Sequence, residues 1–206
     1  MSIGVVDIGM GNLGSLYHAL DSQGWDILPV KTPDDMANLT HLLLPGVGAF
    51  ATAMALLNKV GLIDPIHHFA SNANHIMGIC LGMQILAELG VEGGNTNGLA
   101  MIPGKVLPID LQVGVRSSHV GWNESNQVRS HPILKNIRND VDFYFVHSYI
   151  FVPADTSTVL AQTEYGVRFP SIIGKHNIVG TQFHPEKSQA NGLRLLDNFC
   201  LWDGIC

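Results

Sequence analysis

The first half of the chain alternates apolar runs with stretches of helical periodicity, and this alternation limits the possible folds more than any other feature of the sequence. Strand-like runs cover residues 3–8, 25–30, 41–44 and 75–79, and helix-like stretches cover residues 12–23, 50–59, 62–71 and 81–89. Such alternation is typical of a parallel sheet with helices on its faces. We therefore expect an α/β fold with a mostly parallel central sheet flanked by helices.

The second half of the chain differs, because short strand-like runs dominate after the glycine-rich segment 90–98. They cover residues 105–111, 142–151, 158–163 and 171–183, with a hairpin turn expected at 174–177. A closing helix is expected over residues 188–202, with Ser188 as its N-cap. No linker divides the 206 residues. We therefore expect one domain, residues 1–206, whose C-terminal half adds antiparallel strands.

Cys80 lies at the junction of an expected strand and an expected helix, and a glycine stands two residues away on each side, at Gly78 and Gly82. The Gly-x-Ser-x-Gly elbow of hydrolases needs such small residues because the chain turns sharply from strand into helix. Here sulfur replaces oxygen, and a helix N-terminus behind the thiol would lower its pKa and favour thiolate. The pattern alone leaves a buried structural cysteine as the alternative.

His184 and Glu186 flank Pro185 directly after the apolar run 177–183. A cysteine nucleophile needs a base to take its proton, and the base needs a third group that orients its ring. Pro185 ends the strand, so both side chains can project from one short loop. A hydrogen-bonded histidine at a strand end is the alternative for His184 alone. Together, Cys80, His184 and Glu186 predict a catalytic triad.

Residues 9–14, with the sequence GMGNLG, match the dinucleotide-binding pattern G-x-G-x-x-G between a strand and a helix. That reading requires an acidic residue at the end of the next strand, about 20 residues further on. The chain has Lys31 there instead. A nucleotide-binding oxidoreductase is thus an alternative that the sequence disfavours, and a tight surface loop is the preferred interpretation.

Charge and cysteine content exclude several further classes. The formal net charge is −6, which gives no support for nucleic-acid binding. The three cysteines form neither a disulfide framework nor a C-x-x-C zinc pattern, and His67-His68 has no companion ligands at metal spacing, so we expect no metal and no cofactor. No apolar stretch reaches the roughly 18 residues of a membrane span. We expect a reduced, cytoplasmic protein without a signal peptide.

The motifs around Cys80 and His184 resemble the triad of the class I (triad) glutamine amidotransferases. Within that class, the chain looks most like the family of glutaminase subunits of imidazole glycerol phosphate synthase. The matching segments run along the whole chain, at residues 9–13, 44–50, 80–84, 102–106, 121–123, 143–149 and 184–188. The resemblance implies a flavodoxin-like fold and hydrolysis of glutamine through a cysteinyl thioester. The ammonia would pass to a (β/α)8-barrel synthase subunit, the partner in a heterodimer, for histidine biosynthesis.

The resemblance also implies roles for further residues. Charge that develops on the glutamine amide oxygen needs backbone N–H donors. One donor would come from Leu81, and the other from the loop Gly46-Val47-Gly48, whose glycines permit a peptide flip. The remaining roles are recognition of glutamine by Gln84, Glu92, Ser148 and Tyr149, and contact with the partner by Asn12, Trp122 and Lys187. Trp122 is expected in a surface turn, because glycine and asparagine flank it.

Two departures from the family's pattern concern the expected partner side. The segment 116–120 lacks the proline usual beside its histidine and the methionine usual before the following glycine, and Ile8 stands where a tyrosine is common. One alternative is therefore a paralogous glutaminase that supplies ammonia to another acceptor, such as a sugar-modifying enzyme of surface polysaccharide synthesis. A partner-binding subunit with a vestigial site is a second alternative, which the intact triad argues against.

Overall fold

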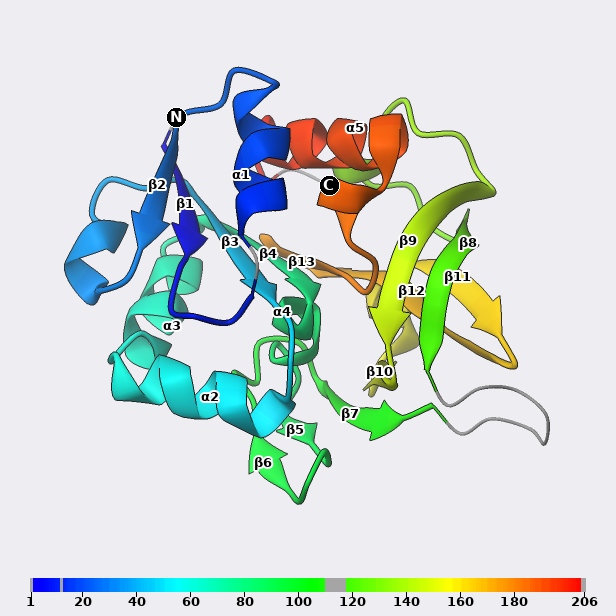
Figure 1. The fold of residues 1–206 in the computed structure, drawn as a ribbon, viewed down its shortest axis with the longest axis horizontal. Coiled ribbons are helices and arrows are strands. Elements are labelled where there is room, and N and C mark those ends of the chain that lie inside the picture. The colour runs from blue at the N-terminus through cyan, green and yellow to red at the C-terminus, as the bar shows by residue number, and fades with distance from the viewer. Residues whose placement is uncertain (1, 12, 110–117, 205–206) are drawn as a thin grey trace.

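A computed structural model describes residues 2–11, 13–109 and 118–204 of the chain (Figure 1). The helices are α1 (Gly14–Asp21), α2 (Phe50–Lys59), α3 (Ile63–Ser71), α4 (Leu81–Gln84) and α5 (Gln189–Cys200), with short 3₁₀ helices η1 (Pro33–Met36), η2 (Pro132–Leu134), η3 (Thr156–Thr158) and η4 (Pro185–Lys187). The strands are β1 (Ile3–Val6), β2 (Ile27–Val30), β3 (His41–Gly46), β4 (His75–Cys80), β5 (Leu89–Gly90), β6 (Thr96–Asn97), β7 (Gly104–Pro108), β8 (His119–Gln127), β9 (Val141–His147), β10 (Tyr149–Pro153), β11 (Val159–Tyr165), β12 (Val167–Lys175) and β13 (Ile178–Thr181).

The large sheet has the strand order β2-β1-β3-β4-β13-β12-β11-β8-β9. Its strands pair in parallel from β2 to β13 and antiparallel from β13 to β9. A smaller sheet, β10-β7-β5-β6, lies beside it. The expected α/β fold is confirmed, and the added strands of the C-terminal half are antiparallel as predicted. The hairpin turn between β12 and β13 also lies where the sequence places it.

Helices cover both faces of the parallel part of the sheet, α1 and α5 on one face and α2 and α3 on the other (Figure 1). The helices and the sheet enclose two hydrophobic cores, one on each face of the sheet, and alternate residues of β3 pack into one core or the other. Leu43 packs in the same cluster as Leu20 of α1, whereas Leu42 and Leu44 pack in the cluster that contains Ile66 of α3. All five side chains are almost fully buried. A strand buried on both faces is continuously apolar, which explains the run of leucines.

The helix expected over residues 81–89 is wrong in length, because α4 ends at Gln84. The carbonyls of Ile85, Leu86 and Ala87 accept hydrogen bonds from the amides of residues 99–102 instead of from the next helical turn. The Leu99 amide, for example, donates to Ile85 at 2.7 Å. A distant segment therefore supplies the hydrogen bonds that would have continued the helix.

The single strand expected over residues 142–151 is also wrong, because it breaks at Ser148. The first part, β9, belongs to the large sheet, and the second part, β10, belongs to the small sheet. Trp122 lies within β8 and not in a turn, because residues 119–125 pair with β9 along their length. Ser148 consequently occupies the corner where the chain passes from one sheet to the other.

Candidate active site

Cys80 ends β4 in a strained backbone conformation, with φ of 55° and ψ of −108°. Positive φ is rare for a residue with a side chain and persists only where neighbours enforce it. A Cβ atom at Gly78 would lie 2.5 Å from the Gly82 carbonyl oxygen, and one at Gly82 would clash with the carbonyl of Leu44. The two glycines therefore let the chain turn back on itself beside β3. This geometry is the predicted nucleophile elbow.

His184 follows β13, the strand that lies beside β4 in the large sheet, and its ring reaches the same edge as Cys80. The Nδ1 atom of His184 lies 2.9 Å from Oε1 of Glu186, and both side chains are more than nine-tenths buried. Burial opposes protonation, but hydrogen bonds and charge interactions with Cys80 and Glu186 outweigh it and raise the pKa of His184 to about 10. The imidazole consequently holds its proton at neutral pH. The structure thus brings the three predicted triad residues together.

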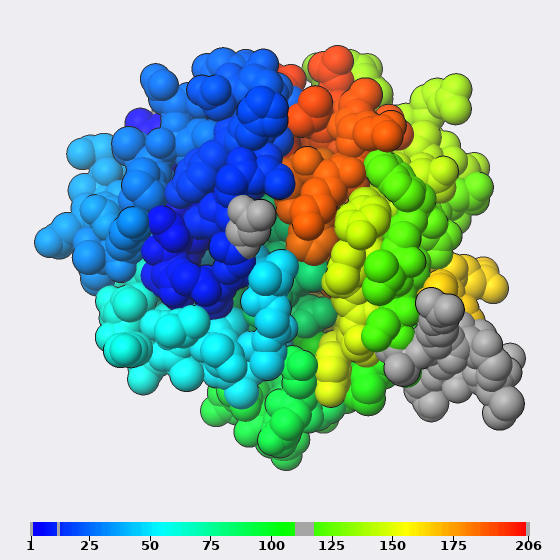
Figure 2. Space-filling model, in the orientation of Figure 1, coloured from blue at the N-terminus to red at the C-terminus, as the bar shows by residue number. Residues whose placement is uncertain are grey.

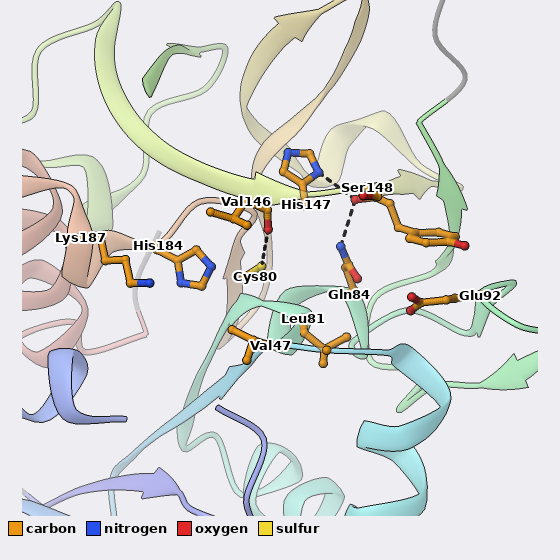
Figure 3. Close-up of a pocket in the computed structure, with 12 residues that line it drawn as sticks. Val47, Cys80, Leu81, Gln84, Glu92, Val146, His147, Ser148, His184 and Lys187 are labelled. Carbon is orange, nitrogen blue, oxygen red and sulfur yellow. Dashed lines mark hydrogen bonds between the residues drawn. The ribbon is translucent and has the colours of Figure 1, made fainter. Parts of the chain in front are cut away.

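A cavity of about 240 Å³ opens beside Cys80 (Figure 3). Its lining includes Val47, Gly48, Leu81, Gln84, Glu92, Ser148, Tyr149 and His184, which the sequence analysis assigned to catalysis or glutamine binding. It also includes Lys187, which was predicted at the partner interface, and Val146 and His147, which had no predicted role. Gly46 is not in this lining, and a Cβ atom added to it would lie 3.2 Å from Cβ of Leu81. One cavity therefore gathers residues from segments as far apart in the sequence as Val47 and Lys187.

The Cys80 sulfur has two further polar neighbours. Its thiol donates to the carbonyl of Val146 at 3.6 Å, drawn as a dashed line in Figure 3. The side-chain amide of Gln182 donates to the sulfur at 3.8 Å, and Gln182 is fully buried. Sequence reasoning missed Gln182, although a glutamine in the otherwise apolar run before His184 could have been noticed.

The loop after β3 holds its backbone amide away from the cavity. The N–H of Val47 donates to the carbonyl of Met10 at 2.8 Å. Gly48 has φ of 106°, and no atom lies within 4 Å of the position of its missing Cβ. An oxyanion donor at Val47 therefore needs a rotation of the peptide between Gly46 and Val47, and Gly46 supplies the backbone freedom for it. The glycine-rich segment of residues 9–14 thus accepts the hydrogen bond of the Val47 amide through the Met10 carbonyl.

The predicted glutamine-binding residues are held by hydrogen bonds within the protein. Gln84 donates through Nε2 to the carbonyl of Tyr149 at 3.0 Å and to Oε1 of Gln182 at 3.2 Å. Oε2 of Glu92 accepts the first backbone amide of α2, from Phe50, at 2.8 Å. Both side chains are therefore preorganised at the cavity wall, and Figure 3 shows them next to each other, to the right of Cys80.

Comparison with known proteins identifies the family. The model of the family described as glutamine amidotransferase class-I matches residues 4–202. The chain belongs to the class I glutamine amidotransferases. Solved structures with TM-scores of 0.77 share this fold at low identity: "Crystal structure of glutamine amidotransferase" (20% identical, 98% of this chain and 99% of that one) and "Structure of PurLQS from Thermotoga maritima" (18% identical, 97% of each chain).

Three relatives of higher identity carry the name "Imidazole glycerol phosphate synthase subunit HisH". The relative from Desulfitobacterium hafniense (strain DSM 10664 / DCB-2) is 42% identical over 97% of this amidotransferase and 94% of its own length. That from Moorella thermoacetica is 44% identical over 96% and 93%, and that from Chromobacterium violaceum is 41% identical over 99% of both. The amidotransferase is therefore matched along nearly its whole length by subunits of a synthase.

The predicted partner-contact residues of the amidotransferase lie in different settings. Lys187 is exposed at the rim of the cavity, and Trp122 is 48% exposed on β8. Asn12 lies outside the described residues. Trp122 shares its face of the sheet with two other exposed apolar residues, Val120 and Val146, because Val120 pairs with Val146 and precedes Trp122 by two positions. We call Val120, Trp122 and Val146 the apolar rim.

The apolar rim reaches the cavity, because Val146 contributes to both. In Figure 2, β8 and β9 stand on the visible face beside the end of β3.

Among the described residues, no group of three or more His, Cys, Asp or Glu side chains could hold a metal ion. No helix in that part of the chain is long and apolar enough to cross a membrane.

Proposed function

We propose that Cys80, His184 and Glu186 are the triad of a glutaminase that acts as the HisH-type subunit of imidazole glycerol phosphate synthase in histidine biosynthesis. The observation that carries the proposal is the strained Cys80 elbow beside the His184–Glu186 pair, in one cavity with every predicted glutamine-binding residue. The near full-length similarity to synthase subunits supports the acceptor reaction.

The chemistry follows from the geometry. The thiol proton of Cys80 passes to His184, and the sulfur bonds to the side-chain carbonyl carbon of glutamine. The C–N bond then breaks as His184 gives that proton to the leaving nitrogen, which departs as ammonia. The product is a γ-glutamyl thioester. His184 next takes a proton from water, whose oxygen bonds to the thioester carbon. The C–S bond then breaks, His184 returns the proton to the sulfur, and glutamate and the thiol are released. Glu186 orients the ring throughout and stabilises its protonated form.

The amide oxygen of glutamine needs two N–H donors while it carries negative charge. Leu81 supplies one at the start of α4. The second requires the Val47 peptide to leave the Met10 carbonyl and turn toward the cavity, with Gly46 and Gly48 as flexible neighbours. Since this peptide points away at rest, we expect weak glutaminase activity from the isolated chain and stimulation when a partner binds beside the loop.

The partner in this proposal is a (β/α)8-barrel synthase subunit that receives the ammonia. It would cover the cavity mouth by binding the apolar rim, with Lys187 and Asn12 at the contact. Exposed valine and tryptophan side chains next to a catalytic opening are suited to such an interface. The proposal places the enzyme in the cytoplasm, where reducing conditions keep the Cys80 thiol free.

The test measures glutamate released from glutamine by the purified chain, alone and with the barrel subunit plus its nucleotide ligand. We expect strong stimulation by the complete mixture and none with Cys80→Ala. The assignment of the acceptor would be refuted if the wild-type chain hydrolysed glutamine through Cys80 but the barrel subunit did not stimulate it. It would favour the alternative of a glutaminase for a different acceptor enzyme.

A further inference from the structure

Two buried histidines, His119 of β8 and His147 of β9, lie beside the active site, and the reaction described above does not use them. Nδ1 of His119 lies 3.0 Å from Nε2 of His147, and Nδ1 of His147 lies 2.9 Å from the carbonyl oxygen of Tyr149. At the other end of the line, the side-chain nitrogen Nδ2 of Asn123 lies 3.2 Å from Nε2 of His119. Four residues therefore form one continuous line from β8 to the wall of the glutamine cavity.

The hydrogen bonds in this line have a single possible direction. Burial lowers the pKa of His119 to about 4 and that of His147 to about 3, so both rings are neutral at pH 7. A carbonyl only accepts, so Nδ1 of His147 must carry the proton and its Nε2 must be an acceptor. His119 must then donate through Nδ1, which leaves its Nε2 to accept from Asn123. The backbone carbonyl of Tyr149 thus sets the tautomer of both rings.

The carbonyl of Tyr149 also accepts from Gln84, so both of its lone pairs are occupied by protein donors. Gln84 uses its Nε2 for this bond and for a bond to Gln182, and both Nε2 hydrogens are thereby taken. What the Gln84 amide can offer a ligand is its acceptor, Oε1. The glutamine side-chain amide carries two N–H donors, which an acceptor on the cavity wall can bind.

We propose that His119 and His147 are positioning residues, which hold the carbonyl of Tyr149 in place and thereby keep the Gln84 amide turned with its oxygen toward the substrate. The inference rests on the proposed function, since that function makes glutamine the ligand of the cavity. A released Tyr149 carbonyl would let the Gln84 amide turn its N–H groups toward those of the substrate.

The surrounding packing holds the line of hydrogen bonds at a fixed angle. The His119 ring is stacked between Phe145 and Tyr165, with ring centroids 4.6 Å and 4.2 Å away. A second hydrogen bond lies at the sheet corner, where the hydroxyls of Ser118, just before β8, and Ser148, just after β9, are 2.8 Å apart. The two contacts thus come from β8 and the residue before it, and β8 also bears two residues of the apolar rim. Docking on this strand would therefore act on the groups that set the pocket.

A matched pair of variants separates positioning from packing. In His147→Asn the side-chain amide takes the place of Nδ1 and keeps a donor for the Tyr149 carbonyl, whereas in His147→Gln it takes the place of Nε2 and loses that donor. Both variants remove the same ring from the same aromatic cluster. We expect the KM for glutamine of the complete enzyme to be about fivefold to tenfold higher in His147→Gln than in His147→Asn, the worth of one hydrogen bond.

The values of kcat and the thermal midpoints of the two variants should be similar, because the lost packing is shared. Ser125→Ala removes a buried hydrogen bond of β8 outside the line, to Ser171, and should leave KM unchanged. Equal KM values in the two His147 variants would overturn the inference.

Nuclear magnetic resonance of the ¹⁵N-histidine-labelled chain tests the line of hydrogen bonds without any activity. We expect His119 and His147 to be neutral with the proton on Nδ1 at pH 7. A proton on Nε2 of either ring, or a doubly protonated ring, would overturn the inference. Wild-type protein that released no glutamate in any mixture would instead refute the proposed function, and the tautomers would still decide whether the line exists.

Discussion

The parallel half of the large sheet holds Cys80 by backbone constraint, whereas the antiparallel half holds the pocket wall by side-chain hydrogen bonds. At the elbow, Gly78 and Gly82 leave no room for a methyl group, and the chain has one way to turn. In β8 and β9, by contrast, His119 and His147 meet through a hydrogen bond between their rings. The comparison shows that the Cys80 elbow depends on close backbone contacts, whereas the position of the pocket wall depends on hydrogen bonds between side chains.

The largest expected effect is the loss of stability and activity in Gly82→Ala, for which Gly121→Ala in the antiparallel half is the comparison. Gly82→Ala forces a Cβ atom into the Leu44 carbonyl. We therefore expect the free energy of unfolding to fall by roughly 3 kcal/mol or more, and no glutaminase activity. Gly121 in β8 has φ of 137°, and the space around an added Cβ atom is open. We therefore expect Gly121→Ala to lower the free energy of unfolding by about 1 kcal/mol, from backbone strain alone. Chemical denaturation of both variants checks the ranking. Equal stability losses would show that the elbow is no tighter than β8.

Glu186→Gln tests the charge that stabilises the protonated His184. Without it, we expect the pKa of His184 to fall from about 10 toward its ordinary value of 6.5. The kcat/KM for glutamine should drop about 100-fold, a typical contribution of oriented acid–base catalysis. A pH profile of the stimulated reaction measures both effects. Retention of wild-type rates across the profile would remove Glu186 from the triad.

Trp122→Ala tests the apolar rim of the antiparallel half. The indole is 48% exposed, so the isolated variant should lose no more than about 0.5 kcal/mol of stability. Binding to the barrel subunit should weaken roughly tenfold, as for an aromatic anchor at an interface. Calorimetric titration gives the affinity, and Leu201→Ala, an exposed residue at the end of α5, serves as the control. Unchanged affinity would place the partner on another face.

The smallest effect should be an acid sensitivity to which the antiparallel half contributes, together with His41 of β3 and His131, whose pKa values burial also lowers to about 4. The folded-state pKa values of His119 and His147, about 4 and about 3, lie below the unfolded value of 6.5. The unfolded chain therefore binds more protons in this range, and stability falls as pH drops below 6.5. The raised pKa of His184 acts oppositely, since its contribution is complete below pH 6.5 and is lost as pH rises through about 10. Thermal midpoints should fall by several degrees between pH 7 and pH 5, and a flat profile would contradict the neutral rings.

Local patterns predicted the elbow because its causes are local. The glycines at 78 and 82 and the apolar strand before Cys80 are all contained in a short stretch of sequence. The pair His184 and Glu186 was equally accessible, since one proline separates them. The helix after Cys80 was predicted too long, because the amides of residues 99–102 take the carbonyls of its expected second turn. No pattern within residues 81–89 contains that competitor.

The sequence by itself determined the α/β class and predicted Cys80, His184 and Glu186 as a triad, since strand–helix alternation and turn chemistry act over a few residues. Tertiary structure alone decided which way the Val47 peptide points, where β9 gives way to β10, and that His119 meets His147 across 28 positions of chain. These features depend on strand pairing in space. Each of these two histidines, seen alone in the sequence, looks like an ordinary core residue, and only the register of β8 against β9 makes them a pair.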